Sequence, residues 1–195
     1  TNQVGQLEEA STRSSATKAS LETAVDRLVV QVKEGLPLTP EKYSYTNRLA
    51  AVNALRDKLA DSKWVTPELQ QEYTNLYVKE LQIAQAQEYF FAKLTVTDQY
   101  GSKVQKWAEC LMNGNWSVDY RTLDGKNIGS YTNVGTTEAT VWGYRENLPD
   151  NVRKATEDKI IANRVPDWQE KVTVLAQKQI AMDNQTGFQK AFGSL

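Results

Sequence analysis

The sequence predicts a mainly α fold, a helical bundle or solenoid of about five helices with a small antiparallel β-meander inserted. Apolar residues recur every three or four positions along most of the chain, and the triplet Thr-Pro-Glu occurs twice ahead of such rows. Only residues 113–145 switch to alternation, and helices are expected again over residues 150–163 and after Trp168. Short connections favour antiparallel packing, so we expect one helical domain over residues 1–195.

The first expected helix has a heptad pattern that is interrupted in its first half. Its a and d positions are occupied by Val4, Leu7, Leu21, Val25, Leu28 and Val32. Ser11, Ser14 and Lys18 break this apolar row. We therefore expect residues 1–18 to fray or be disordered and the helix proper to cover residues 19–34.

The two Thr-Pro-Glu triplets, beginning at Thr39 and Thr66, are expected helix starts. In each, the threonine side chain can cap free amide groups, the proline suits the first turn, and the glutamate complements the positive helix end. The second triplet precedes an apolar row that reaches Leu94, which predicts a helix of about 30 residues, roughly 40 Å long. A further helix is expected to include Val104 to Leu111.

Residues 113–145 have the periodicity of strands. Apolar residues from Trp116 to Tyr120 alternate with polar ones, and Asp124-Gly125 is a typical hairpin turn. Residues 137–144 supply a further expected strand. This β-like insertion is therefore expected to be a two- or three-stranded meander that packs on the helices through its aromatic residues.

Charge and cysteine content exclude several classes of protein. The chain has 23 basic and 24 acidic residues and a net charge of −1, so we predict no nucleic-acid partner. Its apolar runs are far shorter than the roughly 20 residues that span a bilayer, so no transmembrane segment is expected. The single cysteine, Cys110, fits an intracellular location better than secretion. A cleaved targeting sequence would leave the same polar start at Thr1, so the compartment stays open.

Residue patterns for catalysis are scarce. The chain has no histidine, which excludes Ser-His and Cys-His nucleophile pairs and the common zinc motifs. Lys103 and Lys106 would favour a Cys110 thiolate, but a small half-buried side chain is the simpler interpretation. Paired carboxylates such as Glu157-Asp158 leave a two-carboxylate hydrolase as an outlying alternative. We predict no enzyme, no metal and no cofactor, and no small-molecule substrate is evident.

Aromatic residues gather around the β-like insertion, among them Trp116, Tyr120, Trp142 and Tyr144. Such a cluster forms either the core beneath a hairpin or an exposed contact surface, because tryptophan and tyrosine are favoured interface anchors. Both interpretations are open from sequence, and individual residues can serve either role.

The block Ala84-Gln85-Ala86-Gln87-Glu88, followed by Phe90-Phe91, Lys93 and Thr95, resembles the central helices of the Bro-type domain. That domain is the helical module of the ALIX family of ESCRT-associated proteins. The resemblance implies a helical fold that receives an amphipathic helix of an ESCRT-III subunit in a hydrophobic groove. The β-like insertion departs from the family pattern.

The family's aliphatic anchors fall near Lys103 and Trp107 of this chain. With a helix over this segment, the expected partner-binding residues are Val104, Trp107 and Leu111. The presence of Lys103 interrupts an aliphatic patch, which weakens the expectation of ESCRT-III as the partner.

Two functions are therefore expected as alternatives. The first is a non-catalytic, Bro-like helical protein-binding module, a scaffold that receives an amphipathic helix. The second is a structural or accessory subunit of a large macromolecular complex, such as an organellar complex or a virion, in which the aromatic insertion contacts neighbouring subunits. Balanced charge and the lack of catalytic patterns suit both.

Overall fold

The computed structural model describes residues 2–135, 140 and 142–192, and the chain forms two compact units. The first unit contains the chain up to Gly35 together with Glu41–Gln85. The second contains Leu36–Pro40 and the chain from Ala86 onward. We expected one helical domain over residues 1–195, whereas only the first of these units is all helical in its described residues.

The predicted mainly α fold class, a helical bundle, is wrong. The described residues form five α-helices and a five-stranded antiparallel sheet, which is an α+β fold. The main error lies in the strands β1 (Gln87–Thr97) and β2 (Lys103–Asn113), which occupy segments expected to be helical. Across the described part of the chain, no helix combines the length and apolar character needed to cross a membrane.

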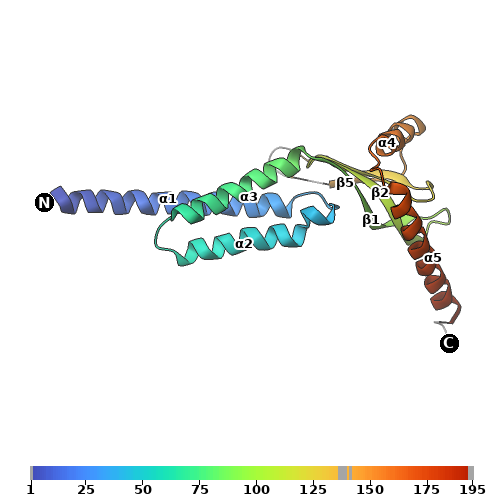
Figure 1. Cartoon of the computed structure of the whole chain (residues 1–195), viewed down its shortest axis with the longest axis horizontal. Helices are drawn as coiled ribbons and strands as arrows, with labels where there is room; N and C mark the ends of the chain where they lie inside the picture. Colours follow the sequence, from blue (N-terminus) through green and yellow to red (C-terminus); the bar gives the residue numbers. More distant parts are fainter. Residues whose placement is uncertain (1, 136–139, 141, 193–195) are drawn as a thin grey trace. The chain divides into compact units, whose positions relative to one another are not determined.

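Three helices form the first unit (Figure 1). They are α1 (Asn2–Lys33), α2 (Tyr45–Asp61) and α3 (Pro67–Gln85), and a short 3-10 helix, η1 (Glu41–Tyr43), precedes α2. α1 includes most of residues 1–18, whose expected fraying stays a prediction. Buried aliphatic side chains from all three helices form the core: Leu21, Val25, Leu28, Val29, Val32, Val52, Leu55, Leu59 and Leu69.

The two expected helix starts have different outcomes. Thr66 caps α3 as predicted, because its side-chain oxygen accepts the backbone N–H of Leu69 at 3.2 Å. The start predicted at Thr39 is wrong for the long helix. There η1 comes first, and α2 begins after Ser44, whose hydroxyl oxygen accepts the backbone N–H of Asn47 at 3.4 Å.

A buried ion pair joins α2 to α3. Arg48 donates two hydrogen bonds to the Glu80 carboxylate, at 2.9 and 2.5 Å, and both side chains are more than nine-tenths buried. Arg48 also donates to the backbone carbonyl of Tyr43 at 3.4 Å, which ties η1 to the same pair. Removing either partner would leave a buried charge uncompensated, so the pair fixes where α2 and η1 meet α3.

The second unit is built on a sheet whose strands follow chain order, β1 to β5. The later strands are β3 (Ser117–Thr122), β4 (Ile128–Asn133) and β5 (Trp142–Arg145), so strands do occupy the predicted insertion at 113–145. The turn predicted at Asp124-Gly125 is confirmed, and Gly125 adopts a φ of 70° there. Of the strand expected over residues 137–144, positions 137–139 and 141 lie outside the described residues.

β1 is a strand because its residues alternate. Phe90, Leu94 and Val96 are buried, while Lys93 and Thr95 between them are exposed, a period of two. The segment is also rich in aromatic and β-branched residues, which favour strands. The apolar residues at 90, 91 and 94 fit a helical row equally well. For this reason the helix was predicted to continue to Leu94, whereas α3 ends at Gln85.

The two faces of the sheet are covered differently. α4 (Asp150–Ala162) and α5 (Trp168–Phe192) pack on the face that carries Glu109 (Figure 1). The opposite face carries Cys110 and Tyr120, both fully buried. On this side the sheet curls, because Glu146, just after β5, accepts the hydroxyl of Thr97 at the end of β1 at 2.9 Å. The two edge strands therefore approach each other at one end of the sheet.

Candidate functional site

The three residues predicted as partner anchors lie on strand β2 and not on a helix. Trp107 and Leu111 lie on the helix-covered face, and Val104 lies on the opposite one. Leu111 is fully buried, and Trp107 is half-buried, with its backbone N–H donating to the side-chain oxygen of Gln179 on α5 at 2.7 Å. The three residues therefore form no helical row, and their contact with a partner stays a prediction.

The four aromatic residues of the expected contact surface divide between core and surface. Tyr120 is fully buried, and its hydroxyl lies 2.8 Å from that of Tyr144. Trp142 is half-buried, and Tyr144 is 39% exposed. Trp116, the last residue of the turn between β2 and β3, is 62% exposed. Tyr120 is thus a core residue, whereas Trp116 presents most of its ring to solvent.

Glu109 on β2 is the centre of a buried ion network. Its side chain is 1% exposed. Arg164, just after α4, donates two hydrogen bonds to the Glu109 carboxylate at 2.7 and 3.0 Å, while Arg121 and Tyr89 donate one each at 3.3 and 2.5 Å. Arg121 also donates to Glu157 on α4 at 3.0 Å. The network therefore connects three strands to α4 and to the segment after it.

This network keeps Glu109 ionised. Burial alone would raise the pKa of Glu109, but hydrogen bonds from Arg164 and Tyr89, together with the charges of Arg164 and Arg121, outweigh burial and lower it. Burial and the hydrogen bond to Glu109 raise the pKa of the Tyr89 hydroxyl. The carboxylate is fully engaged and the phenol stays protonated, so we interpret the network as a structural link and not as an active site.

An exposed apolar row lies on α3. Tyr77, Val78 and Leu81, here called the α3 row, are 40%, 42% and 40% exposed. Spacings of three and four residues place Tyr77 and Val78 beside Leu81 on one side of the helix. Another side of α3 faces the inside of the unit, where Leu69 and Ile83 are buried. The α3 row is thus additional to the apolar surface that folds the helix.

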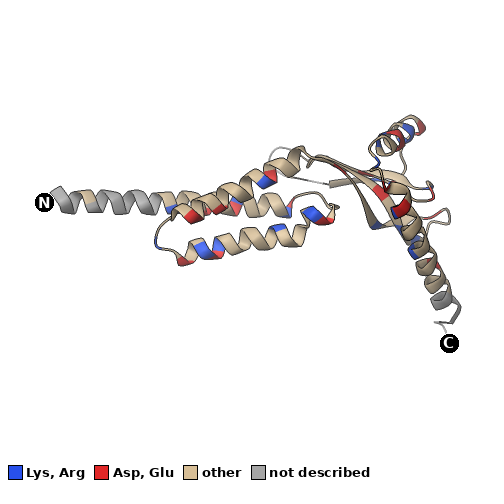
Figure 2. Ribbon diagram, viewed as in Figure 1, with Lys and Arg blue, Asp and Glu red and all other residues tan. Residues whose placement is uncertain are grey.

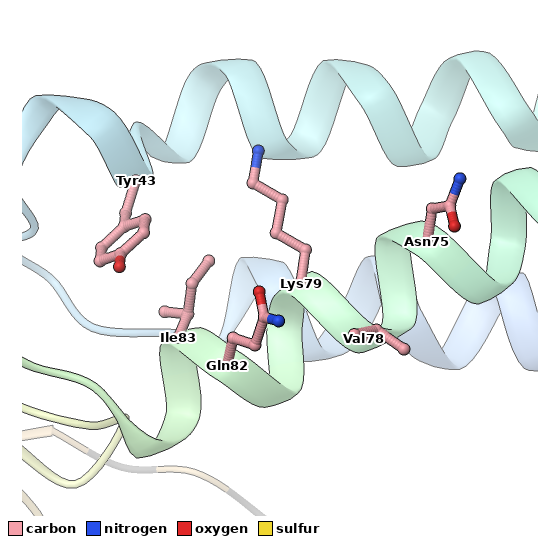
Figure 3. Close-up of a pocket in the computed structure, with 6 residues that line it drawn as sticks. All are labelled: Tyr43, Asn75, Val78, Lys79, Gln82 and Ile83. Atoms are coloured by element: carbon pink, nitrogen blue, oxygen red, sulfur yellow. The ribbon is translucent and has the colours of Figure 1, made fainter.

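A groove runs beside the α3 row. It has a volume of about 380 Å³ and is lined by Tyr43, Asn75, Val78, Lys79, Gln82 and Ile83. Tyr43 of η1 faces Ile83 of α3 across the groove, and the side chain of Lys79 projects from α3 toward α2 (Figure 3). Val78 belongs to the row and also lines the groove, so the two features form one surface.

This surface carries little charge. Among the exposed side chains between positions 74 and 85, Lys79 is the charged one, although charged residues make up 24% of the chain. Beyond Lys79 and the buried Glu80, α3 continues without charged residues to its end (Figure 2). Exposed aromatic and aliphatic side chains with few charges are typical of the centre of a protein interface.

The α3 row was not predicted from the sequence, where the apolar residues from Leu69 to Leu94 were treated as one row of a long helix. A signal was present. The apolar positions of α3 cover too wide an arc of the helix surface to be buried on one side. They are Leu69, Tyr73, Leu76, Tyr77, Val78, Leu81 and Ile83. Some of them had to face solvent or a partner.

Cys110 and metal binding offer no alternative site. The thiol of Cys110 is fully buried, not half-buried as expected, and burial together with the charge of Glu109 raises its pKa. Within the described ranges, no group of acidic and cysteine side chains is arranged to hold a metal ion.

Comparisons of the chain with protein-family models, with curated proteins and with solved structures found no match. The resemblance to the Bro-type domain therefore stays a prediction. Its block of residues spans the end of α3 at Gln85 and the beginning of β1 at Gln87, so it is not one continuous helix.

Proposed function

We propose that this protein is a non-catalytic protein-binding module whose first unit receives an amphipathic helix of a partner along the α3 row and the adjoining groove. The observation that carries this proposal is the α3 row, three large apolar side chains that each expose about two-fifths of their surface. Side chains at three- and four-residue spacing form a ridge, and the ridge of a second helix packs beside it.

The energy available suits reversible binding. Covering the exposed parts of three such side chains contributes roughly 1–2 kcal/mol each by apolar burial. A further contact with Tyr43, a half-buried residue that lines the groove, adds to this. Transient complexes commonly rest on a few apolar anchors surrounded by polar side chains.

The polar residues of the groove indicate the chemistry of the partner helix. Lys79 is the charged side chain of the groove, and Asn75 and Gln82 offer amide donors and acceptors. An acidic side chain beside the apolar row of the partner would therefore pair with Lys79 and set the orientation of the helix.

A binding role without catalysis is supported by how the buried carboxylates are used. Glu80 is paired with Arg48, and Glu109 with Arg164. Because both carboxylates are engaged in holding elements together, neither is poised as a free general base.

The proposal is tested by site-specific photo-crosslinking of the full chain in its native cells. A photoreactive phenylalanine analogue at Leu81 should crosslink to a partner, and peptide mapping should place the crosslink on an amphipathic helix. The same analogue at Asp57, an exposed position of α2, is the matched control and should not capture this partner. Equal capture at both positions would overturn the proposal.

A second variant keeps the test independent of the probe. Val78→Asp places a charge in the row at an exposed position, so the helix content should be unchanged while recovery of the crosslinked partner falls at least tenfold. Partner recovery that is unaffected by Val78→Asp contradicts the proposal. Isolation of the protein solely within a large stoichiometric particle would instead favour the alternative function, a structural or accessory subunit of an assembly.

A further inference from the structure

The second unit contains a cleft whose chemistry differs from that of the α3 row. The cleft has a volume of about 550 Å³ and lies between strands β3 and β4 and helix α4. That volume is within the range of about 300–1,000 Å³ typical of small-molecule sites. Polar side chains from the sheet form its floor, namely Ser117, Asp119, Ser130 and Thr132.

The floor is assembled by strand register. Asp119 lies directly opposite Ser130, and Ser117 lies directly opposite Thr132, so two cross-strand pairs on neighbouring positions of one face bring a carboxylate and three hydroxyls together. Ser117 and Thr132, the outermost of these residues in the sequence, are 15 positions apart. The pairing of β3 with β4 converts them into one polar surface.

Asp119 retains acceptor capacity for a ligand. It is 9% exposed, and it accepts one hydrogen bond from Ser130 at 2.8 Å and one from the Asn113 side-chain amide at 3.0 Å. A carboxylate has about four acceptor positions, so roughly two remain for donors such as ligand hydroxyls. A partly desolvated carboxylate gains more from such donors than an exposed one does.

The rim of the cleft carries two cations. Arg145 of β5 and Lys159 of α4 line the cleft, and both are exposed. Among the described residues, neither forms an ion pair with an acidic side chain. Two cations beside a polar floor are suited to an acidic group on a ligand that is otherwise uncharged.

Trp116 and α4 supply the apolar part of the cleft. Trp116 is 62% exposed at the edge, and the wall from α4 and the segment before it includes the apolar residues Leu148, Val152 and Ala155 beside the polar Asn151 and Thr156. The face of an aromatic ring is electron-rich and attracts the slightly positive C–H groups that cover one face of a sugar ring.

We propose that this cleft binds a saccharide that carries a carboxylate group. The ligand's hydroxyls donate to Asp119 and exchange hydrogen bonds with the serine and threonine hydroxyls, one ring face covers Trp116, and the carboxylate pairs with Arg145 and Lys159. The site goes beyond the protein-binding function proposed above, since its residues all lie in the second unit.

Isothermal titration of the full chain tests the site. The probes are three acidic saccharides, trigalacturonic acid, a hyaluronan tetrasaccharide and N-acetylneuraminic acid. At least one should bind saturably, at least tenfold more tightly than the neutral maltotriose, and acetate should not bind measurably. Trp116→Ala and Arg145→Gln should each weaken that binding at least tenfold. Both positions are exposed, so these variants should fold normally.

Trp64→Ala is the matched control, because Trp64 is 61% exposed and belongs to the first unit. It should leave saccharide binding unchanged. Saturable binding of none of the three acidic saccharides would overturn the proposal. Maltotriose binding as tightly as the acidic saccharides would also overturn it, and so would acetate binding as tightly as they do. Binding of the acidic saccharide by the Trp116→Ala variant with undiminished affinity would overturn it as well.

Discussion

At the scale of single residues, Glu109 illustrates what a buried charge requires in this fold. Removing a carboxylate from water costs several kcal/mol unless hydrogen bonds and opposite charges compensate. Arg164, Arg121 and Tyr89 supply that compensation. The Arg164 guanidinium lies over the ring of Trp168 at the start of α5, 3.7 Å from its centroid, so one carboxylate also helps to place α5.

Substitution Glu109→Gln should destabilise the second unit in a pH-dependent way. The folded-state pKa of Glu109 is lowered, so its stabilising contribution is present above the unfolded pKa of about 4.3 and is lost as the pH falls through the folded value. We expect the variant to lose about 3 kcal/mol of unfolding free energy at pH 7. The loss should shrink as the pH is lowered below 4, measured by urea unfolding at each pH.

The matched control for this experiment is Asp158→Asn. Asp158 forms an exposed pair with Lys154 at 3.0 Å, and its side chain is 59% exposed. Exposed pairs of this kind contribute little, so the control should follow the unsubstituted protein at every pH. A Glu109→Gln curve that is parallel to the unsubstituted one across the whole pH range would contradict the role given to Glu109.

At the scale of elements, the sequence predicted a helix cap and a turn correctly, but it did not distinguish the strand β1 from a helix. Thr66 was predicted to cap a helix and Asp124-Gly125 to form a turn, because both depend on a few neighbouring residues. β1 was taken as helix because short apolar runs fit periods of 2 and 3.6 equally well. The pairing of β1 with β2 decides between them, and pairing is a long-range property.

The candidate sites depend on long-range structure for the same reason. That Val78 and Leu81 are exposed follows from which side of α3 packs against the other helices, and the sequence offers several apolar sides. The polar floor around Asp119 exists through the register of β3 against β4. The sequence shows where an apolar row or a polar residue occurs. It does not show which residues from other helices or strands lie beside it in the folded chain.

Gln179 on α5 completes the hydrogen bonding of β2 where β3 does not reach. β3 pairs with β2 only from Ala108 onward. Before that point, the Gln179 side chain accepts the backbone N–H of Trp107 at 2.7 Å and donates to the backbone carbonyl of Gln105 at 3.1 Å. One side-chain amide therefore takes the place of a neighbouring strand and attaches α5 to the sheet.

Substitution Gln179→Ala should loosen α5 and the first half of β2. Leaving the half-buried N–H of Trp107 unpaired costs about 1–2 kcal/mol. Hydrogen exchange of residues 103–107 and of α5 should become about tenfold faster, while exchange in α1 to α3 stays unchanged. Gln177→Ala, an exposed position of the same helix, is the control and should have no effect. Unchanged exchange at Trp107 would show that Gln179 does not protect this edge.

At the scale of the whole molecule, the chain consists of two units with separate cores. The first unit buries aliphatic side chains among three helices. The second buries residues such as Met112 and Tyr120 within its curled sheet. A chain with two cores can carry a protein-binding surface on one unit and a small-molecule cleft on the other, each held by its own packing.

Two separate cores predict two separable unfolding transitions. Leu55 is fully buried in the core of the first unit, so Leu55→Ala should lower the stability of that unit by about 3 kcal/mol.

Two optical signals distinguish the units. Four of the five tryptophans lie in the second unit, so tryptophan fluorescence reports mainly on it; they are Trp107, Trp116, Trp142 and Trp168. Far-ultraviolet circular dichroism reports strongly on α1, α2 and α3. In urea, Leu55→Ala should shift the main dichroism transition to lower concentration and leave most of the fluorescence transition in place. If both signals shift together by the same amount, the units unfold as one cooperative body and the division into two cores does not extend to stability.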